Sequence, residues 1–252
     1  MIKKLLLSIV IFSSYVTYGQ TNEDNEKLYD LSQQKKYNET INESSRLIKV
    51  YPNSEYAYFY YFMRGLAYCN LNNNYKGVTD YEKCVELNPA YKDGLLNLYL
   101  IYMETENHEK AIPLIKKLID IDDDPDHHYD LGLAYFNSSD YQNSIKCFTN
   151  FLNMGVKDTK QNRLALFLRG RSKNSFEKGS GCEDIKNCLK ESFLESSYYP
   201  ESLVSLGFSA LNYANDSGCI DSYLWQMYAK RVKKASKDLY KKTVKADKKG
   251  KQ

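Results

Sequence analysis

Apolar and small residues recur every three or four positions along most of the chain, with short polar breaks between the periodic stretches. In residues 129–148, Gly132 and Tyr135 precede such a break, and Ser144 and Phe148 follow it. A catalytic loop would gather its glycines and polar groups in one place, so this spacing favours packed amphipathic helices. The pattern predicts pairs of helices at residues 24–34 and 38–50, 55–71 and 75–87, 92–105 and 108–121, 126–137 and 141–153, 161–176 and 182–195, and 200–214 and 219–241.

The same spacing occurs more than once. Gly65 and Gly77 take the places that Gly132 and Ser144 hold further along the chain, and the large residues that follow each of them also match. An intermediate copy at residues 96–121 lies 34 residues after the first and 33 residues before the next. Internal repetition at this period predicts an array of similar helical hairpins.

The repeated hairpin resembles the tetratricopeptide repeat, a helix-turn-helix unit of about 34 residues. The resemblance is clear over residues 55–156 and weaker over residues 25–229. It implies an all-α fold, a right-handed superhelical solenoid of stacked hairpins, because no hairpin can bury its apolar face alone. In the family, small residues at the eighth and twentieth places let the two helices approach closely, and Gly65 with Gly77 fits this pattern. The intermediate copy departs from it, with Tyr99 at the first small place.

Two less regular repeats follow the regular ones. Both contain the sequence Ser-Gly-Cys-x-Asp, and Gly170 precedes Cys182 by twelve residues, as Gly207 precedes Cys219. Twelve residues also separate the small pair of the regular repeats. We therefore interpret these two cysteines as occupying the second small place.

These observations divide the chain into four segments. We predict a signal peptide at residues 1–20, regular repeats at 21–156, degenerate repeats at 157–229, and a basic C-terminal helix or tail at 230–252. The long connection at residues 154–161 is predicted to act as a hinge between the regular and degenerate repeats.

The N-terminus has the three-part pattern of a secretory signal peptide. Lys3 and Lys4 precede an apolar run at residues 5–12, and small residues follow up to Gly19. The run is short for a bilayer span, which needs about 20 residues. We expect cleavage near Gly19 or Gln20 and an exported protein, periplasmic or secreted; the alternative is an uncleaved membrane anchor.

Charge is unevenly distributed along the chain. Residues 230–252 contain eleven Lys or Arg against two Asp, a net charge of +9, whereas residues 21–229 contain 22 basic and 30 acidic residues, a net charge of −8. Such a tail suits an anionic lipid surface or another polyanion. The alternative is a solvated terminal helix. Neither specific nucleic-acid binding nor a small-molecule substrate is predicted.

Catalytic motifs are missing from the sequence. It contains no G-x-S-x-G elbow, phosphate-binding glycine loop or dinucleotide fingerprint. The acidic stretch at residues 120–130 includes His127 and His128, but their spacing fits neither a zinc pair nor a calcium loop. We interpret this stretch as a turn and helix cap around Pro125. The predicted protein is therefore non-enzymatic, without catalytic residues, cofactor or metal.

The six cysteines form no C-x-x-C pair, which excludes zinc-ribbon and thioredoxin-like sites. Cys84, Cys182 and Cys219 fall where the repeat accepts small residues, and a buried cysteine behaves as a small hydrophobe. Packing is the favoured interpretation. An exported protein also permits disulfides, and one in the region of Cys182 and Cys188 is the alternative.

The resemblance implies a concave groove lined by the first helix of each hairpin. The family's carboxylate-binding members carry lysine and asparagine at the fifth and ninth places, where this chain has apolar residues, so an apolar lane that suits hydrophobic anchors is predicted instead. The alternative is that the solenoid's own ends, or a second copy, cover it. The predicted partner-binding residues are Phe59, Phe62, Leu66, Leu96, Leu100, Met103, Tyr129, Leu133 and Phe136.

The sequence thus predicts a scaffold in the cell envelope that binds a protein or peptide through this groove. The alternative function is a surface-associating adaptor whose basic tail binds anionic lipid or a polyanion.

Overall fold

The computed structural model describes residues 23–156, 159–194, 201–221, 224–230 and 233. The predicted signal peptide and most of the basic tail lie outside these residues. The chain divides into two compact units, an N-terminal unit within residues 1–106 and a C-terminal unit within residues 107–252.

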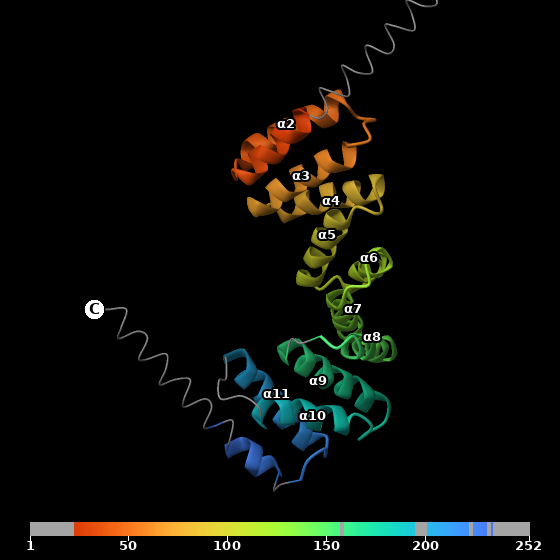
Figure 1. Ribbon diagram of the computed structural model, residues 1–252, viewed down its shortest axis with the longest axis vertical. Helices are drawn as coiled ribbons and strands as arrows, with labels where there is room; N and C mark the ends of the chain where they lie inside the picture. Colours follow the sequence, from red (N-terminus) through yellow and green to blue (C-terminus); the bar gives the residue numbers. More distant parts are fainter. Residues whose placement is uncertain (1–22, 157–158, 195–200, 222–223, 231–232, 234–252) are drawn as a thin grey trace, which may run out of the picture. The chain divides into compact units, whose positions relative to one another are not determined.

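The described residues form helices joined by short turns, and none of them lies in a β-strand (Figure 1). A helix at residues 23–33 opens the N-terminal unit. The remaining helices of that unit are α2 (Tyr37–Val50), α3 (Ala57–Asn70), α4 (Asn74–Leu87) and α5 (Lys92–Glu104). Those of the C-terminal unit are α6 (His108–Ile121), α7 (Pro125–Asn137), α8 (Tyr141–Asn153), α9 (Thr159–Phe176), α10 (Cys182–Leu194) and α11 (Glu201–Asp216).

Consecutive helices pack as pairs within each unit, which confirms the predicted all-α class. The last predicted helix differs from the prediction, because residues 217–221 form a turn and the helix is present over residues 224–230. No helix in the described part of the chain is both long and apolar enough to cross a bilayer.

The α3–α4 hairpin of the N-terminal unit is built on two glycines. A Cβ added to Gly65 would lie 3.1 Å from the carbonyl oxygen of Gly77, and a Cβ added to Gly77 would lie 3.1 Å from the carbonyl oxygen of Gly65. Tyr81 fills the seam beside them and is fully buried. Close approach at the small pair, sealed by a large residue, is the packing that the spacing predicts.

The α7–α8 hairpin of the C-terminal unit uses a glycine and a serine in the same roles. Ser144 Oγ donates a hydrogen bond to the carbonyl oxygen of Gly132 at 3.1 Å, and Phe148 is fully buried beside them. At the start of α7, Asp124 accepts a hydrogen bond from the backbone N–H of Asp126 at 2.9 Å, and Pro125 occupies the first turn. The predicted turn and helix cap is therefore confirmed.

One hydrophobic core extends through the C-terminal unit from α7 to the helix at 224–230. Phe148 and Phe151 of α8 belong to the same buried cluster as Leu166 of α9 and Leu211 of α11, and Leu224 packs against it. The helices on the two sides of the 154–161 connection therefore share this core.

The α9–α10 hairpin corrects the predicted register by one residue. A Cβ added to Gly181 would lie only 1.8 Å from the carbonyl oxygen of Gly170, so Gly181 occupies the second small place. The neighbouring Cys182 instead forms a disulfide with Cys219, with a Cα–Cα distance of 4.9 Å. The prediction that these two cysteines serve as small packing residues is wrong. The alternative of a disulfide involving Cys182 is right in kind, but Cys188 is not the partner.

Candidate functional site

The predicted lane on α3 is only partly accessible. Phe62 is 8% exposed, and its ring lies 5.8 Å from the ring of Tyr81 and 5.1 Å from that of Tyr91. Its side chain therefore belongs to the core of the hairpin. Phe59 and Leu66, from the same predicted set, are half-buried.

Helix α5 presents the most accessible part of the predicted lane. Leu100 is 43% exposed, and Leu96 and Met103 are half-buried. Residues spaced by three and four lie on one side of a helix. These three side chains therefore form an apolar strip along α5, named here the α5 strip.

The predicted lane on α7 also divides into buried and accessible parts. Tyr129 is 8% exposed, with its ring 6.0 Å from the ring of Phe148 and 5.2 Å from that of Phe151. Leu133 and Phe136 are half-buried and pack against the edge of the core. In α7, as in α3, the aromatic residue at the fifth place packs inside its own hairpin and leaves the later positions accessible.

Arg171 extends this surface from α9. Its guanidinium carbon lies 5.0 Å from the ring centre of Phe136, 5.7 Å from that of Phe167 and 5.4 Å from that of Tyr213. Attraction between a cation and ring faces holds such a side chain in place. Across the residues described by the structure, its guanidinium meets no carboxylate, whereas Arg169 is paired with Asp184. Arg171 is thus a positioned cation that pairs with no carboxylate among the described residues.

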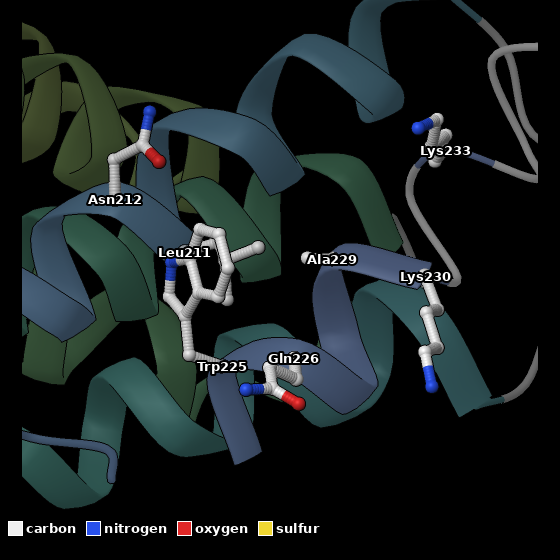
Figure 2. A pocket seen from close by; sticks show the side chains of 7 residues that line it. All are labelled: Leu211, Asn212, Trp225, Gln226, Ala229, Lys230 and Lys233. Atoms are coloured by element: carbon white, nitrogen blue, oxygen red, sulfur yellow. The ribbon is translucent and has the colours of Figure 1, made fainter. Parts of the chain in front are cut away.

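A pocket of about 660 Å³ lies in the C-terminal unit between α11 and the helix at 224–230. In the view of Figure 2, the indole of Trp225 stands beside Leu211, and Lys230 and Lys233 lie beyond Ala229. This cavity is named here the α11 pocket. Its lining residues are Leu211, Asn212, Trp225, Gln226, Ala229, Lys230 and Lys233.

The repeat pattern of the sequence could predict only one wall of the α11 pocket. If Gly207 holds the eighth place of its repeat, Leu211 and Asn212 hold the twelfth and thirteenth, the places of Phe136 and Asn137 in α7. The wall containing Trp225 depends on where the final helix starts and on the disulfide that fixes the preceding turn. Neither follows from helical periodicity.

The two histidines at the start of α7 each lie beside an aspartate of the preceding turn. His128 Nε2 lies 2.6 Å from Asp123 Oδ1, and His127 Nε2 lies 3.2 Å from Asp122 Oδ1. Both imidazoles are buried. Within the residues that the structure describes, no group of three or more His, Cys, Asp or Glu side chains is arranged to hold a metal ion.

The cysteines outside the disulfide are Cys69, Cys84, Cys147 and Cys188. Burial raises the pKa of the Cys84 thiol to about 12 and that of the Cys147 thiol to about 11. The thiolate is the nucleophilic form, so these two groups are inert at neutral pH. Neither thiol has the environment of a catalytic nucleophile.

Comparison with known proteins agrees with this architecture. A tetratricopeptide repeat family model matches residues 60–91 and 95–125. The solved structure of a MamA protein is 16% identical with a TM-score of 0.56, and the match covers 71% of this chain and 100% of that chain. MamA from Desulfovibrio magneticus RS-1 is 16% identical with a TM-score of 0.54, covering 69% of this chain and 98% of its own. No curated protein matches the sequence.

YrrB, a TPR protein with an unusual peptide-binding site, is another similar structure. It is 13% identical with a TM-score of 0.58, and the match covers 75% of this chain and 90% of that chain. Identities this low support a shared fold. Together, the matched repeats and the paired helices show that the chain contains tetratricopeptide repeats at residues 60–91 and 95–125 and has the all-α fold of such repeats.

Proposed function

We propose that this protein is an exported, non-enzymatic scaffold that binds a protein or peptide partner through the apolar residues on the first helices of its hairpins. The α5 strip is the main observation in favour. Leu100 is 43% exposed between two half-buried apolar neighbours, and contiguous apolar surface marks interaction sites more often than a scattered exposed leucine does. Leu133 and Phe136 supply a similar apolar edge in the C-terminal unit.

The similar structures support a binding role. YrrB has a peptide-binding site on the same fold, and helical-repeat proteins use extended surfaces for recognition. The apolar residues at the ninth places, Leu66, Leu100 and Leu133, suit hydrophobic anchors of a partner. A terminal carboxylate would need polar and cationic groups at these positions.

Two features support export. The first 20 residues have the pattern of a signal peptide, and the Cys182–Cys219 disulfide suits a compartment in which disulfides persist. Cell fractionation followed by intact-mass analysis tests this part of the proposal. We expect an envelope or secreted protein that begins near Gly19 or Gln20 and contains one disulfide. A cytoplasmic protein with residues 1–20 retained would contradict export.

Affinity capture from the envelope fraction tests the binding surface. The variant Leu96→Glu plus Leu100→Glu places two charges on the α5 strip and is expected to lose the partners that the wild type retains. The matched control is Val50→Glu plus Leu87→Glu, which changes apolar residues that are 52% and 43% exposed on second helices. The control should retain the partners.

Circular dichroism should first show that both variants are folded. Equal partner sets from the wild type and the α5-strip variant would contradict this surface as the binding site. Deleting residues 234–252 in the same experiment tests the alternative function, because an adaptor that binds through its basic tail would lose its target only in that variant.

A further inference from the structure

We propose that the α11 pocket binds a peptide segment in which a large apolar side chain is followed by carboxylates. This inference rests on the proposed function in one respect, that the protein binds peptides. It adds a second surface and the chemical class of the segment that enters it.

The apolar part of the α11 pocket has the size and lining of a side-chain receptor. Leu211 forms a buried floor at 1% exposure, Trp225 is 36% exposed, and Ala229 is half-buried between them and the lysines. Ligand pockets usually enclose about 300–1,000 Å³ and combine apolar walls with a few polar groups, and 660 Å³ lies within that range. A leucine or phenylalanine side chain inserted beside Trp225 would bury apolar surface on both partners.

The cationic part of the α11 pocket indicates what should accompany the apolar side chain. Lys230 and Lys233 are both exposed and line the end of the α11 pocket that lies beyond Ala229. Neither forms an ion pair within the part of the chain that the structure describes. Carboxylates of a partner would pair with these ammonium groups and accept hydrogen bonds from them.

Arg171 strengthens the preference for an acidic segment. Tyr213, which lies 5.4 Å from the guanidinium carbon of Arg171, follows Leu211 and Asn212 on the same helix. Helix α11 therefore lines the α11 pocket through Leu211 and Asn212 and contacts the Arg171 guanidinium through Tyr213. An acidic peptide that continues from the α11 pocket around α11 toward Tyr213 would bring a carboxylate to Arg171.

Charge also argues against the protein's own tail as the occupant. Residues 234–252 contain eight lysines and two aspartates, a net charge of +6, and would be repelled by the lysines of the α11 pocket. The apolar residues line a hollow, which admits a side chain. Insertion into a lipid bilayer would instead use apolar side chains that protrude.

Trp225 is the only tryptophan of the chain and provides a direct signal of binding. The oxidised protein is titrated with a ten-residue peptide that contains Leu and Phe followed by Asp and Glu residues, and Trp225 emission is recorded. Two comparison peptides replace either the acidic residues by lysine or the apolar residues by serine. We expect saturable binding of the first peptide, binding about tenfold or more weaker for the other two, and a loss of affinity with added salt.

Variants that change the lysines of the α11 pocket but keep Trp225 as the fluorescent reporter test whether the peptide binds there. Lys230→Glu plus Lys233→Glu should weaken binding of the acidic peptide about tenfold or more. The matched control, Lys117→Glu plus Lys146→Glu, reverses two exposed lysines on α6 and α8 and should bind as the wild type does. Equal affinity in the pocket variant and its control would overturn the proposal, as would equal affinity for the lysine-substituted peptide.

Other occupants of the α11 pocket give different results. A Trp225 response to phosphatidylserine vesicles but not to the peptide would assign this surface to a membrane. A concentration-dependent response without peptide, accompanied by dimer in sedimentation, would assign it to a second copy of the chain. Either result would overturn the inference while leaving the α5 strip untested by it. Conversely, peptide binding at the α11 pocket with no loss of partners in the α5-strip variant would contradict only the proposed binding surface.

Discussion

Arg169 donates two hydrogen bonds to the carboxylate of Asp184, at 2.9 and 2.7 Å, across the α9–α10 hairpin. Arg64 and Asp80 form the same pair across the α3–α4 hairpin, at 2.8 and 2.7 Å. Each arginine also donates to a hydroxyl on the preceding helix, Ser45 for Arg64 and Thr149 for Arg169 at 3.2 Å each. The two arrangements, named here Arg–Asp clasps, join each hairpin to the helix before it.

Removing the Asp184 carboxylate should destabilise the C-terminal unit strongly at neutral pH. Asp184 is 5% exposed and also contacts Lys173 Nζ at 2.8 Å, so Asp184→Asn leaves two cations without their counterion. Breaking a buried ion pair in this way costs about 3–5 kcal/mol. Urea denaturation followed by Trp225 fluorescence measures the change. Glu183→Gln, an exposed neighbour on α10, is the control and should cost less than about 1 kcal/mol.

The Asp184→Asn variant should also have a free energy of unfolding that depends less on pH in the acid range. Burial raises the pKa of the Asp184 carboxyl, but hydrogen bonds from Arg169 and Lys173 outweigh burial, so the pKa in the folded protein is lowered. The ionised carboxylate then stabilises the fold above its unfolded pKa of about 3.9, and this contribution is lost as pH falls through the folded pKa. The difference in free energy of unfolding between wild type and Asp184→Asn should therefore have its full size at pH 6 and shrink below about pH 4. A difference that stays constant down to pH 2 would contradict this assignment.

Adding one methyl group at the α9–α10 contact should be costly. In Gly181→Ala the new Cβ would lie 1.8 Å from the backbone oxygen of Gly170, and backbone atoms cannot give way as a flexible side chain can. We expect a loss of about 3 kcal/mol or more in urea denaturation. Gly155→Asn is the matched control, because its φ of +68° lies in the left-handed region that asparagine tolerates and its added Cβ would meet nothing within 4 Å. The control should lose about 1 kcal/mol at most.

Loss of the Cys182–Cys219 disulfide should destabilise the C-terminal unit by about 2–4 kcal/mol, since the bond closes a long loop between residues 37 apart in sequence. The double variant Cys182→Ser plus Cys219→Ser is compared with wild type in urea, with and without dithiothreitol. The reductant should lower the stability of the wild type toward that of the variant and leave the variant unchanged. An equal effect of dithiothreitol on both proteins would place the reducible bond elsewhere.

Phe62 and Leu100 should respond differently to truncation, although the sequence places both in one lane. Phe62 is 8% exposed inside its hairpin, so Phe62→Ala should cost about 3–5 kcal/mol. Leu100 is 43% exposed, and Leu100→Ala should cost less than about 1 kcal/mol while weakening partner capture. Urea denaturation followed by circular dichroism measures both. Similar losses for the two variants would contradict their different placement.

Helical periodicity was sufficient to predict most of the fold, because each hairpin repeats the same local pattern. It predicted α6 at residues 108–121 and α8 at 141–153 with the bounds that the structure has. The register of the α9–α10 hairpin was predicted one residue too far along, because the turn is shorter and glycine and cysteine are adjacent at Gly181 and Cys182. An Arg-Gly pair followed later by Gly-x-x-Asp, shared by the two Arg–Asp clasps, was the signal that would have corrected it.

The candidate site was less predictable than the fold. Register alone places Phe62 and Tyr129 at groove positions, but an aromatic ring is long enough to turn back into the seam, and both rings pack against neighbouring aromatics there. The choice of Cys219 as the partner of Cys182 depends on the three-dimensional path of the chain after α11. The wall of the α11 pocket containing Trp225 depends on that path as well.

The buried thiols can serve as native probes of local unfolding in this protein. Cys84 lies on α4 in the N-terminal unit, whereas Cys147 and Cys188 lie on α8 and α10 in the C-terminal unit. An alkylating reagent reaches a buried thiol only when the surrounding helices separate, so the labelling rate at each cysteine reports the local opening of its own hairpin. Mass spectrometry of the alkylated peptides would then give the order in which the hairpins open, without any engineered probe.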